Sequence, residues 1–103
     1  MIKHIGLMKF RPEAPPEEVA SVLGAIADFV RTIDGLLEVK VGPGLGLPAM
    51  ARGYTHGFVM SFRDAVSLRG YLAHPDHLAV VHRLPDLLDP APDAALVFNL
   101  GAD

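Results

Sequence analysis

The sequence predicts an α+β fold in a single domain that covers residues 1–103. Three observations support this prediction. Several short segments alternate apolar and polar residues as β-strands do, one longer segment repeats apolar residues at helical spacing, and stretches rich in glycine and proline separate them. Half of the residues are hydrophobic and only 20% are charged, so a domain of this size leaves apolar surface that a partner subunit could cover.

Residues 2–10 predict the first strand, with His4, Gly6 and Met8 on one face. Because Gly6 has no side chain, this face carries either a gap beside His4 that could form the floor of a pocket, or a bend or close helix approach. Both alternatives stay open at this point.

A helix follows the prolines at positions 12, 15 and 16. Apolar residues recur every three or four positions from Val19 to Ile33 and include Ile26, which predicts one buried helix face. Asp34 and Gly35 end this helix, since glycine readily adopts the left-handed cap conformation. Residues 36–41 then predict a short second strand.

Residues 42–53 are too rich in glycine and proline for regular structure and predict a loop. The loop lacks the Lys-Ser or Lys-Thr pair of a phosphate-binding loop, so an active-site flap, a dimer contact or a plain connector remain as its roles. Residues 53–62 predict a third strand, with His56, Phe58 and Met60 on one face.

Asp64 is placed to cap a helix over residues 65–72, with Val66 and Leu68 as inward candidates. After the histidine-rich segment discussed next, residues 85–92 form a proline-bounded link and residues 94–100 a last strand. The element order predicts a ferredoxin-like βαββαβ unit with an antiparallel four-stranded sheet. Its uncovered face carries Ile5, Leu7 and Val59, so we expect a homodimer that closes a dimeric α+β barrel.

Residues 71–82 contain three of the five histidines and one of the two tyrosines. Pro75 suits the first turn of a new helix, where the helix dipole favours a neutral His77 that could act as a base. Helical spacing predicts that Leu78, Val81 and Leu84 face the core. His82 lies roughly 140° around the helix from His77 and falls outside the same site.

The same segment also has a structural interpretation. In that interpretation His74 caps the helix start, His77 sits at the edge of the core with a backbone partner, and Tyr71 only packs.

Composition excludes several function classes. Nine basic and twelve acidic residues give a net charge of −3 without a basic run, which disfavours nucleic-acid binding. No apolar stretch is long enough to span a membrane and the N-terminus does not read as a signal peptide, so we expect a cytoplasmic protein. The absence of cysteine removes thiolate nucleophiles and thiolate metal sites.

Three motifs together resemble the stress-responsive dimeric α/β-barrel (Dabb) family. They are Lys3-His4-Ile5, Gly53-Tyr54-Thr55-His56, and the segment Tyr71-Leu72-Ala73-His74-Pro75-Asp76-His77 followed by Val80-Val81. The resemblance covers nearly the whole chain. It implies a homodimer whose two sheets form a central barrel, with a pocket between sheet and helices in each subunit. Family members include plant stress proteins and a plant cyclase that closes a linear polyketide by aldol condensation without a cofactor.

The resemblance also implies residue roles. The positions of the cyclase's catalytic pair match Tyr71 and His77, and the family's pocket histidines match His4 and His56. The cyclase has a tyrosine where this chain has Ile26 and a bulky residue where it has Gly6, so its substrate does not carry over. We predict that Tyr71 and His77 are catalytic and that substrate contacts come from His4, Gly6, Met8, Ile26, His56, Phe58, Met60 and His74.

Three functions are compatible with these residues. The first is a cofactor-free cyclase, lyase or isomerase that binds a small apolar or aromatic carbonyl-containing compound. The second is a non-catalytic dimer that binds a small ligand or acts as a stress-related scaffold. The third, a divalent-metal site at His4, His56, His74 and His77, lacks the spacing and the carboxylates that would enforce it, so we predict no metal and no cofactor.

Overall fold

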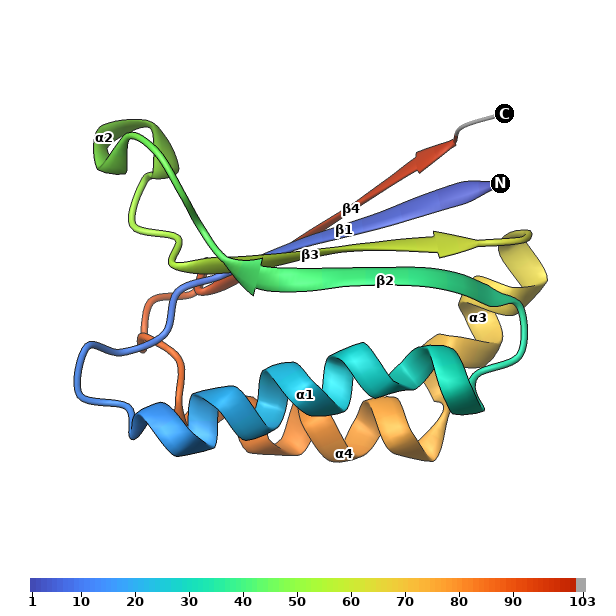
Figure 1. Ribbon diagram of the computed structural model, residues 1–103, viewed down its shortest axis with the longest axis horizontal. Coiled ribbons are helices and arrows are strands. Elements are labelled where there is room, and N and C mark those ends of the chain that lie inside the picture. The colour runs from blue at the N-terminus through green and yellow to red at the C-terminus, as the bar shows by residue number, and fades with distance from the viewer. Residues whose placement is uncertain (102–103) are drawn as a thin grey trace.

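The computed structural model describes residues 1–101 and confirms the ferredoxin-like α+β fold, with one antiparallel sheet and helices on one side of it (Figure 1). The strand order is β2-β3-β1-β4, with every neighbouring pair antiparallel. The strands are β1 (Ile2–Met8), β2 (Leu36–Pro43), β3 (His56–Phe62) and β4 (Ala95–Gly101), and the helices are α1 (Pro16–Thr32), α2 (Pro48–Ala51), α3 (Ala65–Ala73), α4 (Pro75–Arg83) and the 3₁₀ turn η1 (Leu84–Asp86).

Local sequence signals explain most of these boundaries. α1 and α4 both start with proline, and α1 carries Glu17 and Glu18 in its first turn, where the helix dipole favours negative charge. Gly35 has a φ of 79°, as expected of a residue that turns the chain after α1. The side chain of Asp64 accepts a hydrogen bond from the Ser67 N–H and caps α3 as predicted.

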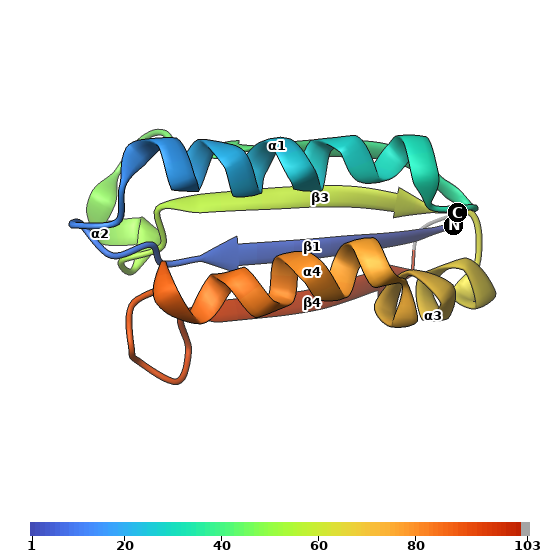
Figure 2. The ribbon, with the colours of Figure 1, turned by 90° about the horizontal axis from the view of Figure 1, so that it is seen from below.

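The core lies between the sheet and the two long helices. α1 runs along the β2 and β3 side, and α4 runs along the β1 and β4 side (Figure 2). Alternation in the strands sends His4, Met8, Met60 and Phe62 into this core, all of them buried. The longer helices α1, α3 and α4 leave the opposite face of the sheet uncovered (Figure 1). Among residues 1–101, no helix is long and apolar enough to cross a lipid bilayer.

Three predictions about packing are wrong. Leu78 and Val81 on α4 are exposed, and so is Val66 on α3, whereas the predicted inward residue Leu68 is buried. The inward positions of α4 belong to His77 and Val80, one residue earlier than the apolar pattern suggested, and Leu84 at the start of η1 packs against the core as predicted. Leu78 lies about 100° around the helix from His77 and turns outward, whereas Val81 lies at the exposed edge of the inward stripe.

The segment between β2 and β3 also differs from the predicted loop. β2 extends to Pro43, and the rest of the segment contains the short helix α2. We call residues 44–53 the arm, because they project from the end of the sheet on the side away from α1 and α4 (Figure 1).

Candidate functional site

Tyr71 is the centre of a cluster of rings between the sheet and the helices. Its side chain is 2% exposed, and its ring centroid lies 4.3 Å from that of His77 and 5.5 Å from that of His4. Phe62 and Phe29 pack on the other sides of the tyrosine ring. The cluster therefore unites β1, β3, α1, α3 and α4, and it contains both residues predicted to be catalytic.

Pro75 explains how Tyr71 and His77 meet. Residue 74 adopts an extended conformation before the proline, so the chain turns between α3 and α4 instead of continuing as one helix. This change of direction brings the first turn of α4 against the end of α3. Tyr71 and His77 thereby become neighbours, although six positions separate them in sequence.

Hydrogen bonds fix the protonation pattern of the two imidazoles. His77 Nδ1 lies 3.2 Å from the Leu72 carbonyl oxygen, which can only accept, so Nδ1 carries the proton and donates it. His4 Nδ1 lies 2.6 Å from Asn99 Oδ1 and donates in the same way. In the neutral form of His77 the Nε2 lone pair is then left to accept a proton.

Burial sets the charge state of the cluster. It lowers the pKa of His77 below the ordinary value of 6.5, and the nearby His4 adds to this effect, while the hydrogen bond to Leu72 acts in the opposite direction. Burial also raises the pKa of the Tyr71 hydroxyl. At neutral pH the pair is a neutral imidazole beside a neutral hydroxyl, that is, a base next to a hydrogen-bond donor.

The Tyr71 hydroxyl keeps a small contact with solvent. Among residues 1–101, the hydroxyl has no hydrogen-bond partner. Every polar side-chain atom of these residues that is sealed from solvent does have such a partner, so the hydroxyl must be in contact with solvent. The hydroxyl therefore borders a space of at least water size. A carbonyl oxygen placed there could accept its hydrogen bond.

The predicted gap at Gly6 is filled. A Cβ atom at Gly6 would overlap the ring of Phe58, its partner across β1 and β3. The same ring lies 5.5 Å from the His4 ring. With Met8, Ile26 and Met60 also buried, the predicted substrate contacts near His4 pack closely against one another.

His56 lies apart from this cluster. It pairs with Met8, four residues along β1 from His4, which corresponds to about 13 Å. Its Nδ1 is 2.9 Å from Thr55 Oγ1, its ring meets the edge of Phe10, and partial burial lowers its pKa. His56 lines a cavity of about 540 Å³ that is formed mainly by the segment after β1 and the start of α1.

His74 has a structural position, as the alternative interpretation predicted. Its Nδ1 accepts a hydrogen bond of 3.0 Å from the Asp76 N–H and caps α4. Within residues 1–101 no three histidine or carboxylate side chains converge to hold a metal ion, so His4, His56, His74 and His77 do not form the site that the metal alternative requires.

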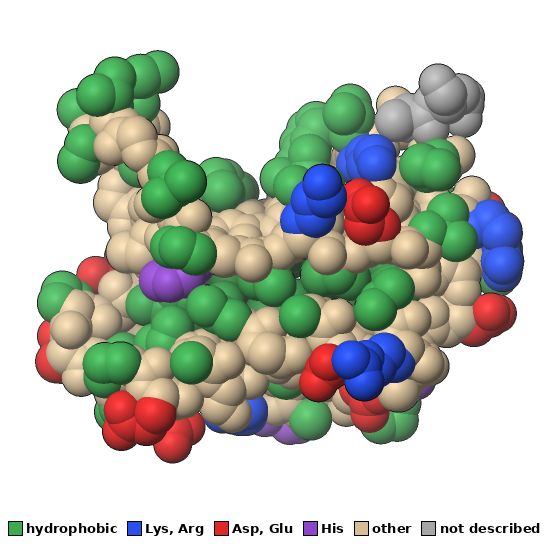
Figure 3. All heavy atoms as spheres, in the orientation of Figure 1, with side chains coloured by type: hydrophobic (Ala, Val, Ile, Leu, Met, Phe, Trp, Pro, Cys, Tyr) green, Lys and Arg blue, Asp and Glu red, His purple; other side chains and the backbone are tan. Residues whose placement is uncertain are grey.

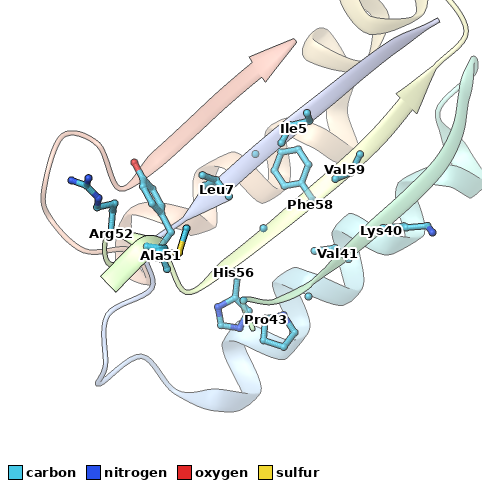
Figure 4. A pocket seen from close by; sticks show the side chains of 16 residues that line it. Ile5, Leu7, Lys40, Val41, Pro43, Ala51, Arg52, His56, Phe58 and Val59 are labelled. Atoms are coloured by element: carbon cyan, nitrogen blue, oxygen red, sulfur yellow. The ribbon is translucent and has the colours of Figure 1, made fainter. Parts of the chain in front are cut away.

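The uncovered face of the sheet is apolar and hollowed. Figure 3 shows hydrophobic side chains on the arm and on the sheet, with a hollow between them. A groove of about 680 Å³ lies there, and the side chains drawn in Figure 4 line it. Exposed apolar residues from three strands continue the surface, namely Leu7, Val59, Leu96, Phe98 and Leu100.

Asn99 and Phe29 are members of the cluster that we did not predict. Asn99 is the only polar residue of β4, and alternation would have placed it on the face of its partner His4. That signal was present in the sequence. Phe29 contacts both Tyr71 and His77, but its pattern is that of any core residue on α1.

Comparison with known proteins identifies the family. Residues 2–97 match the model of the Dabb family, the stress responsive A/B barrel domain. The chain belongs to this family. The ferredoxin-like fold described above is thus the fold of a Dabb domain.

Two curated relatives show how wide the family is. A stress-response A/B barrel domain-containing protein, HS1 of Arabidopsis thaliana, is 27% identical over 77 residues, which cover 75% of this chain and 71% of that protein. Olivetolic acid cyclase of Cannabis sativa is 23% identical over 77 residues, which cover 75% of this chain and 76% of the cyclase.

Solved structures share the fold at low sequence identity. A dimeric ferredoxin-like protein of unknown function from Jannaschia is 22% identical with a TM-score of 0.86, covering 98% of both chains. A hydroxynitrile lyase from Passiflora edulis is 17% identical with a TM-score of 0.79, covering 96% of this chain and 90% of the lyase. The same fold is therefore found in a lyase and in a protein of unknown function, and a cyclase is among the sequence relatives.

Proposed function

We propose that this protein is a cofactor-independent enzyme of the cyclase, lyase or isomerase type that acts on a small carbonyl-containing aromatic or polyketide-like compound. The observation that carries the proposal is the 4.3 Å ring contact between Tyr71 and His77, with the proton of His77 held on Nδ1. The similarity to olivetolic acid cyclase supports the same class of chemistry.

The proposed step is proton abstraction next to a carbonyl group. His77 Nε2 takes the proton from the α-carbon, the C–H bonding electrons move toward the carbonyl oxygen, and the Tyr71 hydroxyl donates a hydrogen bond to the resulting enolate. The imidazolium then returns the proton to carbon or passes it to a leaving oxygen. Because burial lowers the pKa of His77, the base is ready in its neutral form at pH 7.

Hydrogen–deuterium exchange tests this step without knowledge of the natural substrate. Acetophenone and benzoylacetone carry acidic α-protons beside a carbonyl and an aromatic ring, and NMR in D₂O follows their exchange. We expect the protein to accelerate the exchange of at least one of them. His77→Ala should lose about 100-fold or more of the acceleration, as removal of a general base does.

The control for this experiment is His82→Ala. His82 lies on the same helix but is exposed, outside the ring cluster. The His82→Ala variant should accelerate the α-proton exchange of the probe as much as the unmodified protein does. Equal rates for the His77→Ala variant and the unmodified protein would show that His77 is not the base.

A second candidate is a non-catalytic protein that binds a small ligand or serves as a stress-related scaffold. Close packing around Tyr71 favours it, since neither the 680 Å³ groove nor the 540 Å³ cavity is lined by Tyr71, His77 or His4. In that case Tyr71→Phe and His77→Ala should lower the melting temperature while no probe exchanges faster than in buffer.

In either case we propose that the working unit is a homodimer. The uncovered face carries Phe98 at 63% and Val59 at 40% exposure, and β4 has a free edge without a charge or a proline. An apolar face next to an unprotected edge strand favours association. The Jannaschia protein with the same fold is described as dimeric.

A further inference from the structure

We propose that Phe58 sets the size of the compound that can reach Tyr71 and His77. Its ring fills the space above Gly6 beside His4, which is the space that the carbon skeleton of a substrate would need. The inference takes the ligand class from the proposed function, but it concerns the shape of the site and can be tested by binding alone.

The register of the sheet places Phe58 at the boundary between two regions. On β3 it stands between His56, which pairs with Met8, and Met60, which pairs with His4. The His56 end opens into the 540 Å³ cavity, whereas the His4 end leads to the ring cluster. Phe58 itself lines the 680 Å³ groove, and its ring lies 5.5 Å from the His4 ring, so it stands between that open groove and the ring cluster.

The packing of Phe58 differs from that of its neighbours on the same face. Met60 and Phe62 are completely buried, but Phe58 is only partly buried and lies at the edge of the core cluster. A ring that keeps solvent contact has fewer neighbours to hold it in place. Gly6 is the reason that the ring fits there, since any larger residue would overlap it.

The substrate class follows from this position. With the ring in place, neither the 680 Å³ groove nor the 540 Å³ cavity reaches Tyr71, so we infer that the site takes at most a short-chain or single-ring carbonyl compound. Compounds with a second ring or a long alkyl chain would need the volume that Phe58 fills. Phe58 is therefore a specificity-determining residue and takes no part in proton transfer.

Phe58→Ala tests the proposal, and Phe10→Ala is its matched control. Phe10 is also a phenylalanine in the core on the same side of the sheet, but its ring meets His56 instead of His4. The probe is benzophenone, a two-ring ketone, titrated into each protein while NMR follows the imidazole signals of His4 and His56. An apolar cavity of ring size binds aromatic compounds.

We expect Phe58→Ala to bind benzophenone at least about tenfold more tightly than the unmodified protein, with the His4 signals shifting. Phe10→Ala should shift only the His56 signals. The proposal is overturned if Phe58→Ala binds no better, or if the unmodified protein already binds benzophenone at His4. Should Phe58→Ala fail to fold, Phe58→Leu gives the same comparison with a smaller cavity.

A double-mutant cycle checks the geometry independently. Gly6→Ala should destabilise the unmodified protein, because the new methyl group displaces the Phe58 ring, and it should cost much less in the Phe58→Ala background. Equal losses in both backgrounds would contradict the position of the ring. Tight binding at His4 without α-proton exchange in any variant would leave Phe58 as the size limit and refute only the proposed catalysis.

Discussion

The two faces of the sheet are built from the same four strands but reach different states. On the helix-covered face, Met60 and Phe62 are completely buried and even the polar His4 is only 3% exposed. On the uncovered face, the next residue along β3, Val59, is 40% exposed. The chain buries the centre of the first face by itself, although Val97 of β4 on that face stays 58% exposed, and the proposed dimer would bury the second face. The proposed chemistry and the proposed assembly thus use alternate residues of the same strands.

The largest expected effect is a loss of stability on the helix-covered face. Phe62→Ala should lower the free energy of unfolding by about 3–5 kcal/mol, because it leaves a cavity in a packed core. Val59→Ala, on the same strand, should lower the free energy of unfolding of the isolated subunit by only about 0.5 kcal/mol. Urea unfolding at low protein concentration measures both, and similar losses for the two variants would mean that the faces are equally packed.

On the uncovered face, we expect a substitution to weaken the association of the dimer and to leave the folding of the subunit unchanged. Phe98→Glu places a charge in the middle of the proposed interface and should weaken dimer association by at least about 2 kcal/mol. The subunit itself should stay folded, since Phe98 is largely exposed within it. Sedimentation equilibrium measures the association of the dimer, and circular dichroism shows whether the subunit is folded. A Phe98→Glu protein that remains as dimeric as the unmodified one would place the interface elsewhere.

The smallest expected effect is a dependence of stability on pH that comes from His77 on the helix-covered face. Burial lowers the pKa of His77 in the folded state, so below about pH 6.5 the unfolded chain binds a proton that the folded chain does not. Stability is therefore complete above this pH and falls as the pH drops toward the folded-state pKa. The melting temperature of His77→Gln should fall less between pH 7.5 and 5.5 than that of the unmodified protein.

Part of this pH dependence should remain in His77→Gln, because burial also lowers the pKa of His56. The control is His82→Gln, which changes an exposed histidine of the same helix and should behave like the unmodified protein. An identical pH dependence for His77→Gln and the unmodified protein would show that His77 titrates as freely as it does in the unfolded chain.

The sequence by itself determined the order of the elements and their local chemistry. Pro75 at the start of α4, the Asp64 cap of α3 and the left-handed Gly35 were predictable because each depends on a few neighbouring residues. Alternation also predicted correctly that His4 and Met60 share the covered face. The resemblance to the Dabb family added the pairing of Tyr71 with His77, which spacing alone could not specify.

Only the tertiary structure decided how the candidate site is filled. The inward position of His77 displaced Leu78 from the core, because a helix rotates to satisfy all of its contacts and the apolar pattern reports only some of them. The Phe58 ring filled the gap at Gly6, and the strand register moved His56 away from His4. These outcomes depend on which side chains meet across the sheet, and no local pattern contains that information.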